Sequence, residues 1–147
     1  MKEQDKFTGH FRNVSVRFSR LYTRILTRAD LTFPQYALLN YLSIAGIVPM
    51  TQVSKELHIS KPAVTNLVDR LENNKYLKRL PHPKDRRIYL LRIQPKGAQI
   101  VRKTQSQVLR ILLQTLNQFN AHERRVINQF YSLLATTIGN ALKVTRK

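Results

Sequence analysis

The chain has 147 residues, enough for one domain with its own core but too few for two large domains. Its 26 Lys and Arg outnumber 8 Asp and Glu, giving a formal net charge of +18, so a polyanionic partner is expected, the alternative being a solvated basic surface with no partner. The absence of cysteine excludes disulfides, thiolate chemistry and cysteine-ligated zinc.

The N-terminal third of the chain predicts two helices. Apolar residues spaced three and four apart, which predict one stripe along a long first helix, are Phe7, Phe11, Val14, Phe18, Leu21 and Ile25. A second helix is expected over Gln35 to Ala45, with Thr32 or Phe33 near its cap, Pro34 in its first turn and Gly46 at its end. The stripe on the first helix requires a partner helix to cover it.

Two short helices separated by a three-residue turn follow. Thr51 is expected to cap a helix over Gln52 to Leu57, and Ser60 to cap one over Lys61 to Asn74. Apolar residues recur on one face of each segment, so the two helices should pack against each other. This arrangement is typical of a helix-turn-helix, whose second helix exposes its opposite face.

The pattern then changes to strand, loop, strand. Strands are expected over Tyr76 to Leu80 and Ile88 to Ile93, joined by a loop with two prolines. The stretch from residue 75 to residue 92 holds seven Lys and Arg against Asp85 alone. This loop should therefore project as a basic finger beside the second helix of the pair.

The C-terminal third returns to helical periodicity. Helices are expected over Lys96 to Phe119 and Ala121 to Lys143. Together with the first helix they carry more apolar surface than one small helix-turn-helix can cover, which predicts a homodimer. If the polyanion is DNA, two copies related by a two-fold axis would place the second helices of their pairs about 34 Å apart, one turn of the duplex, with other half-site spacings as the alternative.

The second helix of the pair carries the residues expected to read DNA. One polar stripe at helical spacing comprises Pro62, Thr65, Asn66, Asp69 and Asn73. In a major groove, Asn66 could pair with adenine and Thr65 could touch a thymine methyl. Lys61 and Arg70 flank the stripe and suit phosphates. The alternative is that this polar stripe is simply a solvent-exposed helix face with no partner.

The loop between the strands is the second expected contact. An arginine at a protruding tip can enter the minor groove, where the potential is more negative if the groove is narrow. Asp85 lies between cations and is expected to brace a neighbouring guanidinium, the alternative being a turn-forming Asp.

Six segments resemble the MarR family of transcription regulators, in order and in spacing. They are Leu31-Thr-Phe-Pro-Gln, Gln52-Val-Ser-Lys-Glu-Leu57, Ser60-Lys-Pro-Ala-Val-Thr65, Val68-Asp-Arg-Leu-Glu72, Asp85-Arg-Arg87 and Lys96-Gly97. The resemblance covers nearly the whole chain. It implies a mainly α fold with a small β-hairpin wing, that is, a winged helix-turn-helix over residues 31–94 flanked by dimerisation helices over 1–30 and 95–147, all within one domain.

The resemblance also implies a function: a homodimeric, sequence-specific regulator, more often a repressor, that binds a near-palindromic site on double-stranded DNA. The residues expected to contact DNA are Ser60, Lys61, Pro62, Thr65, Asn66, Asp69, Arg70, His82, Lys84, Asp85, Arg86 and Arg87. By position, Asp85 and Arg87 resemble the family's wing aspartate and minor-groove arginine. A small anionic aromatic ligand near His10, Arg17, Phe33 and Tyr36 is a further expectation from the family.

Other classes of function lack support in the residues. The four histidines lie on separate predicted elements without ligand spacing, and no phosphate loop, nucleophile elbow or paired carboxylate occurs, so neither a metal, a cofactor nor an enzyme is expected. No stretch reaches the roughly 20 apolar residues of a membrane helix, and the start lacks a signal-peptide core, so a cytoplasmic location is expected. The alternatives are an architectural protein with little sequence preference and a membrane-surface or RNA-binding module.

Overall fold

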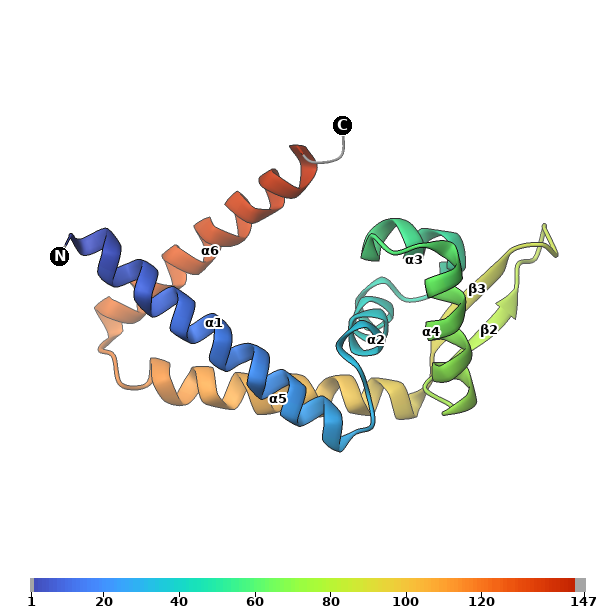
Figure 1. The fold of residues 1–147 in the computed structure, drawn as a ribbon, viewed down its shortest axis with the longest axis horizontal. Helices are drawn as coiled ribbons and strands as arrows, with labels where there is room; N and C mark the ends of the chain where they lie inside the picture. The colour runs from blue at the N-terminus through green and yellow to red at the C-terminus, as the bar shows by residue number, and fades with distance from the viewer. Residues whose placement is uncertain (1, 145–147) are drawn as a thin grey trace. The chain divides into compact units, whose positions relative to one another are not determined.

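The computed structural model describes residues 2–144. Along this part of the chain lie six helices and three strands (Figure 1): α1 (Glu3–Arg28), α2 (Phe33–Ala45), β1 (Val48–Pro49), α3 (Met50–Leu57), α4 (Lys61–Asn73), β2 (Leu77–Pro81), β3 (Tyr89–Ile93), α5 (Pro95–Leu116) and α6 (Ala121–Val144). Residues up to Ser106 form one compact unit and residues from Gln107 a second. The predicted division into 1–30, 31–94 and 95–147 stays a prediction.

Helix boundaries follow local capping chemistry. At the start of α2 the Thr32 side chain accepts from the Gln35 N–H at 3.4 Å, and the Gln35 side chain accepts from the Thr32 N–H at 2.8 Å. Gly46, with φ of 78°, ends this helix as predicted. Local residues therefore determine both ends of α2.

The start of α3 corrects one prediction. The helix begins at Met50, with Pro49 as its N-cap, so Thr51 lies inside the first turn and is not the cap. The reason is β1, which pairs Val48 with Leu91 and holds the residue before the helix in an extended conformation. A two-residue strand is too short to show any period in a sequence.

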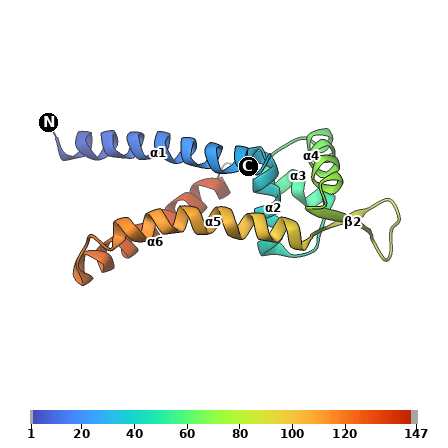
Figure 2. The same cartoon turned by 90° about the horizontal axis from the view of Figure 1, so that it is seen from below.

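The wing is a three-stranded antiparallel sheet in the order β1-β3-β2. The long hairpin of β2 and β3 was predicted, and its register places Arg79 opposite Leu91. In the views of Figures 1 and 2 the loop joining the two strands extends beyond α4 and stands clear of the other elements of its unit. On this loop Pro83, Lys84, Arg86 and Arg87 are exposed, while His82, Asp85 and Ile88 are partly buried.

The core of the first unit is built around α2, which contacts α1, α3, α4 and β3. Side chains that are fully buried there include Leu26, Leu38, Leu39, Leu42, Val53, Val64, Val68, Leu71, Leu77 and Leu91. Val64, Val68 and Leu71 lie at helical spacing on α4, so this helix is anchored by one face. The opposite face is left exposed.

The junction with α5 depends on one glycine. A Cβ atom on Gly97 would collide with the backbone carbonyl of Tyr76. Beside it, Lys96 Nζ donates to the Asn74 carbonyl at 3.0 Å and lies 4.6 Å from the centre of the Tyr76 ring. The start of α5 therefore packs closely against the segment that follows α4. Only glycine at position 97 permits this close approach to the Tyr76 carbonyl.

The second unit contains the later part of α5 and α6. The turn between them is closed by Asn120, whose side chain accepts from the N–H groups of His122 and Glu123, while Glu123 accepts from the Asn120 N–H at 2.8 Å. Across residues 2–144, no helix combines the length and apolar character needed to span a membrane.

Candidate nucleic-acid interface

The two helices of the predicted helix-turn-helix are joined by a tightly bonded corner. His58 ends α3 in the left-handed conformation, with φ of 51°, and the Ser54 hydroxyl donates to the Ile59 carbonyl at 2.7 Å. Ser60 then caps α4, accepting from the Ala63 N–H at 3.3 Å. Since the Ser60 side chain serves as this cap, its first role is to start the helix.

The outward face of α4 carries the predicted polar stripe. Pro62, Thr65, Asn66 and Asp69 are exposed. The Thr65 hydroxyl donates to the Lys61 carbonyl at 3.1 Å, which leaves its oxygen and methyl group facing outward. This face can therefore offer an amide, a hydroxyl and a methyl to base edges.

A cluster that sequence reasoning missed joins α4 to the wing. The Arg79 guanidinium on β2 forms ion pairs with Asp69 and Glu72, and the Arg79 backbone N–H donates to Glu72 Oε1 at 2.8 Å. Burial alone would lower the pKa of Arg79, but its hydrogen bonds with the two carboxylates raise that pKa above its ordinary value. The signal in the sequence was two acids three residues apart on α4, ahead of a run of cations.

This cluster changes the role of Asp69. The sequence places Asp69 in the stripe that faces bases, whereas in the structure its carboxylate is held by a cation from the wing. Because an unpaired carboxylate would repel DNA phosphates, Arg79 neutralises Asp69 at the edge of the candidate interface. We name Arg79, Asp69 and Glu72 the wing clamp.

The wing loop is organised by His82 and Asp85. His82 Nδ1 accepts from the N–H groups of Lys84 and Asp85, each at 3.2 Å. Asp85 Oδ1 accepts from the Arg87 N–H at 3.0 Å, and the Asp85 carbonyl accepts from the Ile88 N–H at 3.1 Å. Asp85 therefore forms a turn, which is one of the two roles expected for it from the sequence.

Asp85 also braces Arg87, which the other expectation proposed. The Arg87 Nε and terminal nitrogen lie 3.1 Å from the two carboxylate oxygens of Asp85. The Arg87 side chain and then its backbone N–H lower the pKa of Asp85 below its usual range, and Asp85 raises the pKa of Arg87. The Arg87 side chain remains 90% exposed, so it is oriented without being covered.

A small cleft lies between α4, the candidate reading helix, and the wing. It has a volume of about 170 Å³ and is lined by residues from the start of α3, the start of α4, the end of the wing loop and the start of β3. Lys61, Thr65 and Arg87 all line it. The residues predicted for the major groove and for the minor groove thus border one surface. Lys84 and Arg86 are exposed on the same loop.

The four residues predicted for a ligand are only partly brought together. Tyr22, Phe33 and Tyr36 form an aromatic cluster with ring centres 6.0 to 6.3 Å apart. Burial and the neighbouring Tyr22 raise the pKa of Tyr36. Arg17 lies on α1 and donates to Asn13 at 2.8 Å. His10 is 12 residues before Tyr22 on the same helix, roughly 18 Å along its axis.

Within residues 2–144, no three or more His, Asp or Glu side chains are grouped so that they could hold a metal ion. The exposed cations of α4 and the wing remain the chemically distinctive feature of this unit.

Comparison with known proteins agrees with this geometry. The model of the MarR family matches residues 29–88, from the end of α1 to the wing loop. The part of the chain that forms the winged helix is therefore similar to the MarR family. The multiple antibiotic resistance protein MarR of Salmonella typhimurium is 32% identical over 87 residues, which cover 59% of this chain and 60% of that protein. The chain thus spans about 60% of the length of the curated MarR protein it matches.

Solved structures share the fold along most of the chain. A MarR family protein from Bacillus stearothermophilus has a TM-score of 0.80 at 23% identity, covering 95% of this chain and 99% of that one. A mutant of S. aureus MepR bound to an oligodeoxyribonucleotide has a TM-score of 0.71 at 20% identity, covering 90% and 97%. These neighbours confirm the mainly helical fold with a small wing that the sequence predicts.

Proposed function

We propose that the protein is a homodimeric transcription regulator that binds a near-palindromic site on double-stranded DNA, acting as a repressor. The observation that carries this proposal is the placement of Lys61 and Thr65 on α4 beside Arg87 of the wing, around one cleft. A helix in the major groove and an arginine in the adjacent minor groove require such a juxtaposition. The MarR-family match and the nucleic acid on the MepR structure support it.

The proposal is tested by selecting bound sites from randomised duplex. We expect an inverted repeat whose half-sites lie about one helical turn apart, bound about a thousandfold more tightly than random duplex at matched salt. Equal affinity for both would favour the architectural protein that the net charge of +18 also suits.

Arg87 provides a residue-level prediction. Arg87→Ala should weaken binding to the selected duplex by about 1 to 3 kcal/mol, because an oriented minor-groove cation is lost. The affinity of Arg87→Lys should lie between those of Arg87→Ala and the unaltered protein. Lysine keeps the positive charge but loses the two-nitrogen contact with Asp85. Fluorescence anisotropy measures both, with Arg102→Ala on α5 as a control for charge. Equal losses in Arg87→Ala and Arg102→Ala would show that Arg87 acts only through net charge.

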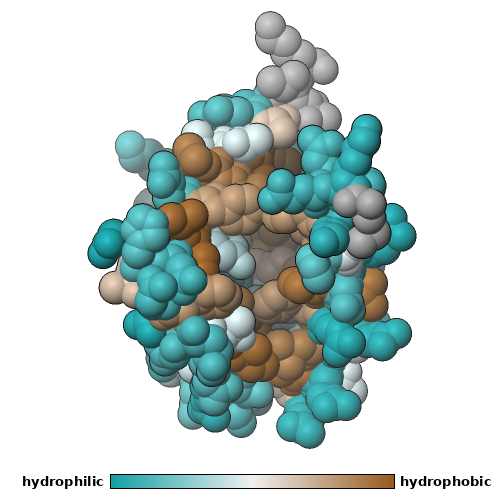
Figure 3. Space-filling model, turned by 90° about the vertical axis from the view of Figure 1, so that its left-hand side faces the viewer, coloured by the Kyte–Doolittle hydropathy of each residue, from teal (hydrophilic) through white to brown (hydrophobic). Residues whose placement is uncertain are grey.

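The homodimer rests on uncovered apolar surface. On α1, Phe11 is 64% and Val14 50% exposed; on α6, Leu133 and Leu142 are each 61% exposed. Figure 3 shows apolar side chains gathered at the surface, between hydrophilic ones, on the side of the molecule it presents. Surface of this kind marks an interface, and a second copy of the chain is the partner we propose.

Disrupting that surface should separate the subunits. Leu133→Lys places a charge in the proposed interface, and we expect a shift from dimer to monomer, together with loss of binding to the inverted repeat. Sedimentation equilibrium measures the shift. Asn128→Lys, an exposed position on the same helix, adds the same charge and should remain a dimer. A Leu133→Lys variant that stays dimeric would place the interface elsewhere.

The response to a small anionic aromatic ligand stays a prediction from the family. The aromatic cluster supports it, because Phe33 is 58% exposed and offers a ring face at the junction of α1 and α2. Titration with benzoate, followed by the fluorescence of the three-ring cluster, tests it.

A further inference from the structure

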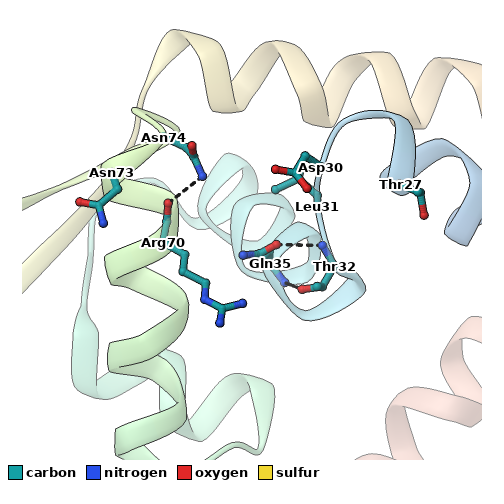
Figure 4. A pocket seen from close by; sticks show the side chains of 8 residues that line it. All are labelled: Thr27, Asp30, Leu31, Thr32, Gln35, Arg70, Asn73 and Asn74. Atoms are coloured by element: carbon teal, nitrogen blue, oxygen red, sulfur yellow. Dashed lines mark hydrogen bonds between the residues drawn. The ribbon is translucent and has the colours of Figure 1, made fainter.

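A polar cleft lies apart from both the aromatic cluster and the wing. Its volume is about 400 Å³, and its lining comes from the end of α1, the start of α2 and the last turn of α4. Figure 4 shows Asp30 and Arg70 reaching toward the space from opposite walls. All of these residues belong to the first compact unit.

The charged groups of this cleft have no partners in the part of the chain that is described. Neither the Asp30 carboxylate nor the Arg70 guanidinium forms a hydrogen bond or ion pair with another of residues 2–144. Asp30 is held in place by its backbone, which has φ of 53° and donates its N–H to the Thr27 carbonyl at 3.1 Å. The backbone that carries this negative charge is therefore held in position, in a protein that otherwise has few acids.

Neutral hydrogen-bonding groups lie between the two charges. Gln35 is only 6% exposed, and its side-chain oxygen is occupied by the Thr32 N–H, so its NH₂ group is the end that can serve a ligand. Asn74 donates its NH₂ to the Arg70 carbonyl at 3.0 Å, which leaves its side-chain oxygen as an acceptor. One wall thus adds a donor and the other an acceptor.

We propose that this cleft binds a small zwitterion, with its carboxylate on Arg70 and its ammonium group on Asp30. A guanidinium binds a carboxylate through two parallel hydrogen bonds, and an ammonium group matches a carboxylate acceptor. A phosphate or sulfate fits poorly, because Asp30 would repel a dianion. An aromatic acid fits poorly as well, because the lining is polar apart from Leu31 and contains no ring.

The cleft also connects to DNA binding, a step that rests on the proposed function. Arg70 lies on α4, and the sequence assigns it to a DNA phosphate. A ligand carboxylate and a phosphate would compete for the same guanidinium. Occupancy of the cleft therefore lowers affinity for duplex, and by linkage duplex lowers affinity for the ligand.

Calorimetric titration without DNA tests the cleft itself. The probes are glycine, β-alanine, γ-aminobutyrate and 6-aminohexanoate, which separate the two charges by increasing lengths, with butyrate and butylamine as singly charged references. We expect saturable binding that peaks at one chain length and is about tenfold weaker for either reference, the loss of one charge-assisted hydrogen bond. No binding by any of the four zwitterions would overturn the proposal.

Two variants identify the binding groups. Asp30→Asn keeps a residue that tolerates positive φ, and should bind the best zwitterion and its singly charged carboxylate analogue equally. Arg70→Gln should lose the carboxylate contact and bind about tenfold less. Arg12→Gln on α1 removes one positive charge outside the cleft and should bind as the natural chain does. An unchanged preference for the zwitterion in Asp30→Asn would contradict the assignment.

The link to DNA is measured separately, by anisotropy with the selected duplex and the best zwitterion. We expect duplex affinity to fall as the zwitterion saturates, and to be insensitive to it in Arg70→Gln. Ligand binding with unaltered duplex affinity would overturn the competition. Ligand binding by a protein that does not prefer any duplex would overturn the proposed function while the cleft stands.

Discussion

Arg79→Met is expected to lower affinity for the selected duplex by about tenfold or more, with a loss of stability of about 1 to 3 kcal/mol. The substitution leaves the carboxylates of Asp69 and Glu72 without their cation, at the edge of the surface that meets phosphates. It also releases β2 from α4, because those contacts join the two elements. The first effect weakens binding by electrostatic repulsion, and the second weakens it by loosening the placement of the wing.

Salt dependence separates the two effects. Repulsion between exposed carboxylates and phosphates is screened over about 8 to 10 Å at ordinary ionic strength, so the defect in affinity should shrink as salt is added. Adding Asp69→Asn to Arg79→Met should restore part of the affinity, since one repelling charge is removed. Anisotropy gives the affinities and urea denaturation the stability.

A matched control is available on the neighbouring strand. Arg92→Met removes the same charge from β3, where Arg92 is exposed and pairs in register with Lys78. For Arg92→Met we expect only a small loss of affinity for the selected duplex, the effect of removing one distant positive charge. If Arg79→Met and Arg92→Met weaken binding equally, the wing clamp has no role beyond net charge.

Gly97→Val is expected to destabilise the first unit by about 3 kcal/mol, near the upper end of what overpacking causes. A Cβ atom at this position would collide with the Tyr76 carbonyl, which accepts from the Gln94 N–H at 2.9 Å and cannot move without losing that bond. The collision would part the start of α5 from the chain that leaves α4. Thermal unfolding followed by circular dichroism measures the loss.

Gly9→Ala is expected to stabilise the protein when thermal unfolding is measured in the same way. Gly9 lies inside α1 with nothing within 4 Å of an added Cβ, so the change should stabilise by roughly 0.5 to 1 kcal/mol through helix propensity. No loss of stability in Gly97→Val would mean that the collision with the Tyr76 carbonyl is relieved by movement elsewhere.

Much of the fold could be predicted because its signals are local. Thr32, Gly46 and Ser60 mark helix ends through caps made within a few residues, and the structure places them there. The apolar spacing on α4 likewise predicts which face is buried, since burial follows the helical period. Asp85 and Arg87, two residues apart, could be matched from their positions alone.

Other features depend on residues that are distant along the chain. The strand β1 exists because Val48 meets Leu91, 43 positions later, and that pairing moves the start of α3 ahead of Thr51. The wing clamp likewise requires β2 to fold back along α4, which removes Asp69 from the set of free polar residues on the stripe. No period or cap encodes such contacts, because they arise from the packing of whole elements.

The sequence by itself therefore determined the mainly helical fold, the reading helix and the basic wing, because charge, caps and apolar period act within a few residues. Only the tertiary structure decided that Lys61, Thr65 and Arg87 border one cleft, that Arg79 neutralises the acids of α4, and that Asp30 and Arg70 line one polar cleft. The physical reason is that electrostatic pairing depends on distance in space, which is set by the burial of Leu38, Val68 and Leu91 in a common core.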